Sequence, residues 1–315
     1  MDDADCSPQS SSSQHAPPAR MMTTHTSAFS ILYSVQITLN NRYWDTSDEC
    51  RRFLKGDPRL DLVTARHVLS HTSGFPNWRS TEEPLKLHFT PGERWSYSGE
   101  GYCYLQSVVT HLTGKVNPKE CAAFEAGVRF CATDMDDYMR ANVLGPFGMT
   151  SSGYLWNDRI ENHVARGHDE KGRPSETSRK PTGPSVARYG MAGGLFTTPT
   201  DYAQFLTEII DPKACDVFRL NNNSLAEMLR PQVKRNAQSS WALGWEIDHT
   251  GNANFIRHGG GNPGFQCLVA ASVELKSGCV MMTNSENGYY GIISKLITGE
   301  ILPRSLGGKL RGSSE

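Results

Sequence analysis

Residues 95–99 have the sequence Trp-Ser-Tyr-Ser-Gly, and residues 258–261, far along the chain, have the sequence His-Gly-Gly-Gly. Directly after the first segment, apolar residues at helical spacing predict a helix over residues 99–112, with Gly114 as its stop signal. The second segment lies at the end of a run of residues, 254–258, that predicts a β-strand. A helix start and a strand end are therefore the local structures expected at the two segments.

On both sides of these segments, other sequence patterns predict further helices. Thr64 can cap a short helix over residues 65–71, and Thr198-Pro199 can open another with proline in its first turn. The segment Ser-Leu-Ala-Glu at residues 224–227 is typical of a capping box. Helices are also expected over residues 134–143 and 289–301, whereas residues 167–190 lack periodicity and predict a long loop.

The pattern changes to short strands after residue 240. Strands are expected over residues 241–247, 254–258, 265–272 and 279–283, separated by glycine-containing turns. Connections this short permit antiparallel hairpins only, because a parallel crossover needs a dozen or more residues. Helices followed by a strand meander predict an α+β fold, with an antiparallel sheet flanked by helices and a mostly helical subdomain.

The N-terminal region has a different composition. Residues 1–26 begin acidic and then become rich in serine and proline, which predicts a disordered tail. Residues 28–39 are rich in β-branched and aromatic residues and predict a strand. The expected organisation is a tail over 1–26, an atypical segment over 27–56, and one domain over 57–315. Within that domain the mostly helical region is 57–195, and helices plus the sheet occupy 196–315.

Composition limits the function and the surroundings of the protein. The chain has 315 residues and a net charge of −1, so no strong positive field favours nucleic acid as a partner. We expect no membrane span, because the longest apolar stretch near the N-terminus is too short. No basic segment precedes an apolar one in the first 25 residues, which predicts no signal peptide and a cytoplasmic location.

The eight cysteines are scattered and form no Cys-x-x-Cys pair. Without an export signal we expect reduced thiols. Cys103, Cys267 and Cys279 lie in apolar runs typical of buried free cysteines, while Cys121 and Cys131 are close enough in sequence to pair across a short loop.

Several segments, in a fixed order, resemble the serine β-lactamase-related family, which includes class C β-lactamases, D,D-peptidases, D-aminopeptidases and family VIII esterases. The resemblance extends from about residue 57 to about residue 301. Several motifs in this order within one chain indicate the fold, and they indicate any single activity less strongly. The segments that carry it are residues 63–74 (Val-Thr-Ala-Arg-His-Val-Leu-Ser-His-Thr-Ser-Gly), 91–98, 144–149, 192–195, 243–245 and 258–260.

The resemblance implies acyl transfer on an ester or amide substrate. It assigns Tyr97 as a proton shuttle and His258 as the histidine of the family's third motif, so these are the expected catalytic residues. Ser98, Gly259, Gly260 and Gly261 are the expected substrate-binding residues, with the Gly261 N–H as one oxyanion donor. Independently of the resemblance, glycines in a strand allow a substrate backbone to approach closely. The alternatives are a Tyr97 hydroxyl that ties a loop to the sheet and a plain glycine turn.

Two departures from the family pattern concern the chemistry. Gly99 stands where the resemblance implies an asparagine, whose amide would hold the substrate. No Ser-x-x-Lys occurs anywhere in the chain, although the family takes its nucleophilic serine and activating lysine from that motif. Three explanations remain open: a truncated or mis-spliced gene product, a pseudoenzyme, or an enzyme with a substituted nucleophile.

Two functions are compatible with the sequence. The first is a β-lactamase-related serine hydrolase acting on a small-molecule ester, amide or peptide. The second is a catalytically inactive binding or scaffold protein. We expect no cofactor and no metal: His67 and His71 have a spacing that can bind zinc, but no third ligand accompanies them and both are interpreted as structural.

Overall fold

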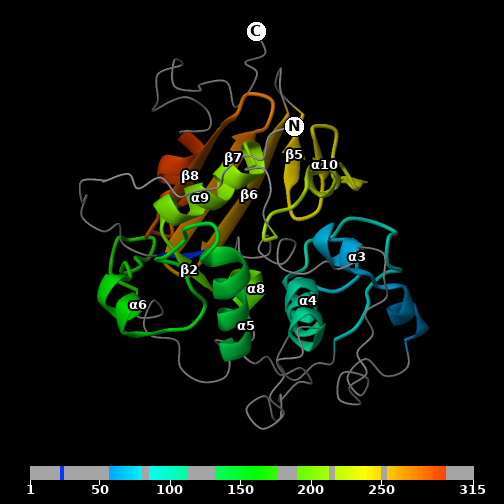
Figure 1. The fold of residues 1–315 in the computed structure, drawn as a ribbon, viewed down its shortest axis with the longest axis horizontal. Coiled ribbons are helices and arrows are strands. Elements are labelled where there is room, and N and C mark those ends of the chain that lie inside the picture. The colour runs from blue at the N-terminus through cyan, green and yellow to red at the C-terminus, as the bar shows by residue number, and fades with distance from the viewer. Residues whose placement is uncertain are drawn as a thin grey trace, which may run out of the picture.

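The computed structural model describes residues 22–24, 57–79, 85–112, 132–175, 190–212, 217–249 and 254–295. An antiparallel sheet in the order β3-β4-β5-β6-β7-β8 forms the upper part of the molecule in Figure 1. Each strand pairs with its neighbour in sequence, which confirms the expected meander. The strands are β1 (Met22–Thr24), β2 (Leu195–Thr197), β3 (Val233–Lys234), β4 (Ser239–Trp241), β5 (Glu246–Asp248), β6 (Phe255–Asn262), β7 (Phe265–Ser272) and β8 (Ser277–Thr283).

The sheet differs from the sequence prediction at two places. The strand predicted over 241–247 is instead two strands, β4 and β5, separated by a turn in which Gly244 has a φ of 85°. A positive φ of this kind costs a glycine nothing, so an apolar run can still contain a turn. The strand predicted to end at His258 continues through the glycines to Asn262, where it turns into β7.

Capping side chains mark the residues at which several of the helices begin. The Thr64 and Thr198 hydroxyls cap α3 (Ala65–Leu69) and α9 (Pro199–Ile210), as predicted. The predicted capping box is wrong: α10 (Asn222–Leu229) begins earlier, because the Asn221 side chain accepts from the Ser224 N–H. The other helical elements are η2 (Pro58–Leu62), α4 (Gly99–Leu112), α5 (Ala132–Met139), η3 (Arg140–Leu144), α6 (Asp158–His163), α8 (Gly190–Gly193) and η5 (Tyr289–Ile293).

One large hydrophobic core joins the sheet to the helices. Helix α9 lies across the sheet and packs on β7 and β8, while α4 packs against α3 and α8 below it (Figure 1). Core side chains come from α3, α4, α9 and the strands, including Leu69, Leu105, Phe205 and Val269. One core therefore joins the helical part of the molecule to the sheet.

The N-terminal segment differs in part from its prediction. Met22–Thr24, inside the segment 1–26 predicted to be disordered, forms β1 and pairs antiparallel with β2. The two β-branched threonines suit a strand, and they follow the Ser/Pro-rich part of the tail. The predicted strand over 28–39 lies outside the described residues. In the described ranges no helix combines the length and the apolar character that crossing a membrane requires.

The structure describes Cys103, Cys267 and Cys279, the three cysteines that lie in apolar runs. Cys103 and Cys267 are buried, and Cys279 is half-buried. Cys121 and Cys131 lie outside the described residues.

Candidate functional site

His71 connects the end of α3 to the segment that carries Tyr97. Its backbone is left-handed, with a φ of 55°, and its side chain is completely buried. The His71 carbonyl accepts from the Ser96 N–H at 2.8 Å, and its Nδ1 accepts from the Ser98 N–H at 3.0 Å. The residues on either side of Tyr97 are thus fixed by one histidine.

Accepting at Nδ1 places the proton of the neutral His71 ring on Nε2. This Nε2 is buried and has no hydrogen-bond partner among the described residues. Burial, and secondarily the neighbouring His258, hold the pKa of His71 well below its ordinary value. His71 is therefore a neutral side chain at physiological pH.

Aromatic rings bring Tyr97 and His258 together. The Tyr97 ring centroid lies 4.1 Å from that of His71 and 6.2 Å from that of His258. Trp241 packs against both, with its ring centroid 6.0 Å from that of Tyr97 and 5.6 Å from that of His258. The two residues expected to be catalytic, which lie far apart in sequence, belong to one cluster, and Trp95 packs against Trp241 at its edge.

The electrostatic environment of Tyr97 keeps its phenol protonated. Burial, and secondarily the Cys267 thiol, raise the pKa of Tyr97 to about 12. Cys267 lies on β7 directly opposite Gly260 of β6. Its place beside the cluster was missed by sequence analysis, which interpreted it only as a buried free thiol; the register of the β6–β7 hairpin is the signal that reveals it.

Among the described residues, the end of strand β6 beside this cluster has an edge without a strand partner. Its pairing with β5 ends at Arg257, whereas its pairing with β7 continues to Asn262. On the β5 side, residues 258–262 therefore extend past the last strand pair that the structure describes. Gly259 and Gly261 are exposed there, so an extended molecule can approach the backbone closely.

Ser98 has structural contacts that the sequence did not predict. Its side chain is buried, donates to the Pro76 carbonyl at 2.8 Å and accepts from the Gly101 N–H at 2.8 Å. This is the bonding of a helix cap at the start of α4. The expected role of Ser98 in binding substrate stays a prediction.

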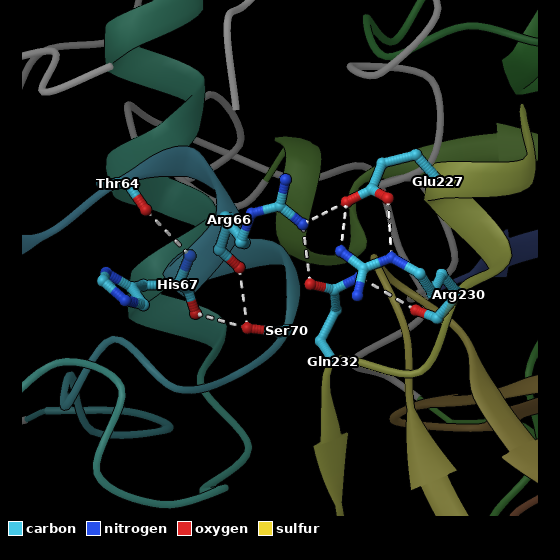
Figure 2. A network of polar contacts seen from close by, with 7 residues as sticks. All are labelled: Thr64, Arg66, His67, Ser70, Glu227, Arg230 and Gln232. Atoms are coloured by element: carbon cyan, nitrogen blue, oxygen red, sulfur yellow. Dashed lines mark hydrogen bonds and ion pairs between the residues drawn. The ribbon is translucent and has the colours of Figure 1, made fainter. Parts of the chain in front are cut away.

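A polar network holds α3 against α10 and the strand region, as Figure 2 shows. Arg66 forms an ion pair with Glu227 and donates to Gln232 at 2.7 Å, and Glu227 also pairs with Arg230 at 2.7 Å. Next to it, the Gly244 N–H donates to the Leu69 carbonyl at 2.8 Å. These contacts join the element that precedes His71 to the turn that follows Trp241.

His67 lies on α3 and His71 lies just beyond its end, and the two histidines have separate partners. His67 Nδ1 lies 3.0 Å from the Leu62 carbonyl, while His71 contacts Ser98. Among the residues that the structure describes, no group of three or more metal-ligating side chains is present. Both histidines contact the backbone that surrounds them.

Comparison with known proteins decides the family. The family model described as Beta-lactamase matches residues 40–291, most of the chain. The chain belongs to the beta-lactamase family.

Curated relatives in this family are distant in sequence. The chain is 23% identical to Penicillin-binding protein 4* of Bacillus subtilis (strain 168), over 76% of this chain and 55% of the relative. It is 22% identical to the Putative penicillin-binding protein PbpX of the same organism, over 77% of this chain and 56% of the relative. The chain therefore spans about half the length of these relatives.

Solved structures confirm the α+β fold with its antiparallel sheet. An octameric penicillin-binding protein homologue from Pyrococcus abyssi matches with a TM-score of 0.64 at 19% identity, covering 89% of this chain and 66% of that one. A class C beta-lactamase matches with a TM-score of 0.63 at 16% identity, covering 84% and 77%. At these identities the likeness shows the fold.

Proposed function

We propose that this beta-lactamase-family protein binds an ester or amide carbonyl at the Tyr97–His258 cluster and transfers its acyl group. The observation that carries the proposal is the 6.2 Å approach of the Tyr97 and His258 rings beside the edge of β6 that has no strand partner among the described residues. Gly259, Gly260 and Gly261 would align the substrate backbone along that edge. The Gly261 N–H would be an oxyanion donor, because an N–H aimed at the developing charge stabilises it.

The proposed roles of the two side chains differ. With a pKa of about 12, the Tyr97 phenol is protonated at neutral pH and can donate its proton, but it does not act as a resident base. His258 is the neighbouring group that can accept a proton from the attacking nucleophile. In this scheme His258 accepts the proton of the nucleophile, Tyr97 donates its proton to the leaving group as the acyl bond to that group breaks, and the proton held by His258 then returns to the Tyr97 phenolate.

A second candidate function is favoured by the same electrostatics. The sequence contains no Ser-x-x-Lys, the motif from which the family takes its nucleophile and its activating lysine. The two causes of the raised Tyr97 pKa both oppose ionisation. A protein that binds carbonyl compounds at this cluster without turning them over would have these properties.

Intact mass spectrometry separates the two candidates. Folded protein is incubated with a fluorophosphonate and, separately, with a labelled penicillin. A stoichiometric adduct supports acyl transfer, and peptide mapping then identifies the nucleophile, the Cys267 thiol and the chain's hydroxyl groups being the alternatives. Folded protein without an adduct, but with a ligand-dependent rise in Tm, supports the binding protein.

Tyr97→Phe is the matched variant for this experiment. It keeps the ring that packs on His71 and removes only the hydroxyl. If Tyr97 transfers a proton, the rate of adduct formation falls by about 10²- to 10⁴-fold while the Tm stays close to that of the wild type. An unchanged rate would contradict the role proposed for Tyr97.

A further inference from the structure

Trp78 occupies the space that a side chain at position 99 would fill. A Cβ atom placed on Gly99 would lie 2.3 Å from Cη2 and 2.5 Å from Cζ2 of Trp78. Real Cβ atoms do not approach other heavy atoms this closely. The far end of the indole therefore lies directly over the first residue of α4, where the family pattern has an asparagine side chain.

The loop on both sides of Trp78 is fixed to the start of α4. The Asn77 side chain accepts from the Gly99 N–H at 3.0 Å, and the Asn77 carbonyl accepts from the Glu100 N–H at 3.0 Å. On the other side, Arg79 forms an ion pair with Glu100 at 3.2 Å, and these two side chains are only 5% and 3% exposed. A buried ion pair is costly to break, so the backbone that carries the indole has little freedom to move.

In spite of this anchoring, Trp78 leaves a large apolar surface in contact with solvent. Its exposed fraction is 43%, whereas Trp241 and Trp245 are 4% and 0% exposed. Gly99 is two residues from Tyr97, a separation of about 7 Å at most along the chain. A half-exposed indole on an anchored backbone thus lies next to the candidate site, and an aromatic ring presented in this way suits a ligand ring.

We infer that Trp78, together with Gly99, determines the specificity of this site, and that the pair selects acyl compounds with an aromatic side group. The inference rests on the proposed binding of ester or amide compounds at Tyr97. An asparagine at position 99 would offer a hydrogen bond, whereas the indole offers an apolar face. A ligand amide placed there loses a polar partner, but a ligand phenyl ring gains a stacking surface.

Binding of a matched ligand pair tests the specificity. N-phenylacetylglycine and N-acetylglycine share a carboxylate and an amide and differ by one phenyl ring, and calorimetry measures both affinities with no need for turnover. The wild type should bind the phenylacetyl compound about tenfold more tightly, because an aromatic contact of this kind is worth roughly one factor of ten.

Three variants give the controls. Trp78→Leu should reduce the phenyl preference to about one, and Trp78→Phe should retain most of it. Tyr290→Leu, which removes an aromatic side chain that is 79% exposed on η5, should leave the preference unchanged. A wild type without a phenyl preference, or a preference that survives Trp78→Leu, would overturn the inference.

A stability experiment tests the pairing of the two positions without any ligand. Gly99→Asn alone should lower the Tm, because its Cβ meets the indole, whereas Trp78→Ala with Gly99→Asn should recover most of that loss. Additive effects would contradict the pairing. If this coupling is present but Tyr97→Phe changes neither labelling nor binding, the proposed function fails while the structural pairing of Trp78 with Gly99 stands.

Discussion

At position 71, a histidine has a left-handed backbone and a buried, neutral ring. Because its pKa is lowered in the folded state, the unfolded chain binds a proton that the folded chain does not. Stability is therefore complete above the ordinary histidine pKa of about 6.5 and falls as the pH decreases below it. We expect the free energy of unfolding to fall by as much as ~1.4 kcal/mol per pH unit between pH 6.5 and the lowered pKa.

His71→Asn tests this expectation, since asparagine tolerates a positive φ. The variant should be less stable than the wild type at pH 7.5 but should lose stability less steeply on acidification, as measured by urea unfolding. Burial also lowers the pKa of His67, so the slope decreases without vanishing. A slope in His71→Asn equal to that of the wild type would contradict the account.

Single residues were predicted from the sequence to different degrees. Tyr97 and His258 could be identified because each belongs to a short ordered motif. The roles of Trp78 and Cys267 could not, because each depends on a contact with a residue from another element, Gly99 in one case and Gly260 across a hairpin in the other. Contacts of this kind follow from register and loop path, which no local pattern contains.

At the scale of elements, the network of Figure 2 fixes α3 to α10. A hydrogen bond from Arg230, opposed by desolvation and assisted by Arg66, lowers the pKa of Glu227 to about 2. The carboxylate therefore stabilises the fold above the ordinary glutamate pKa, and this contribution is lost as the pH falls through about 2. Glu227→Gln should lower the free energy of unfolding by about 1 kcal/mol at pH 7, with a smaller difference at pH 3.

The exposed ion pair between Lys276 and Asp211 provides the control for this measurement. Its side chains are 69% and 64% exposed, so solvent screens the pair. Asp211→Asn should change the free energy of unfolding by less than about 0.5 kcal/mol. Equal effects of the two substitutions would show that the α3–α10 network adds nothing beyond an ordinary surface pair.

Elements that carry their own end signals could be predicted closely. The α4 and β7 bounds coincide with those expected, and Thr64 and Thr198 cap their helices. The errors occur where tertiary pairing prevails over local composition. The apolar run over 241–247 turns at Gly244 because the Gly244 N–H donates to the Leu69 carbonyl of another element.

At the scale of the whole molecule, the fold class followed from the order of helices and strands. The way in which the helical region and the sheet region attach to each other could not be predicted. It depends on side chains from distant segments that fill one core. The hydrophobic cluster runs without interruption from α3 and α4 through α9 into β6 and β7. The expected subdivision into a mostly helical region and a sheet region therefore does not separate two hydrophobic cores among the described residues.

A continuous core predicts that both regions unfold together. Leu69 on α3 and Ile256 on β6 are 1% and 5% exposed and belong to the same cluster. Replacing either by alanine should cost about 2–5 kcal/mol and shift the whole of a single thermal transition, seen at the same temperature by far-UV and near-UV circular dichroism. Leu275→Ala, at a side chain 58% exposed, should leave that transition within about a degree. The contrary outcome is two transitions, each shifted by only one of the two core substitutions. It would mean that the core does not couple the two halves of the site. Tyr97 could then separate from His258 without global unfolding.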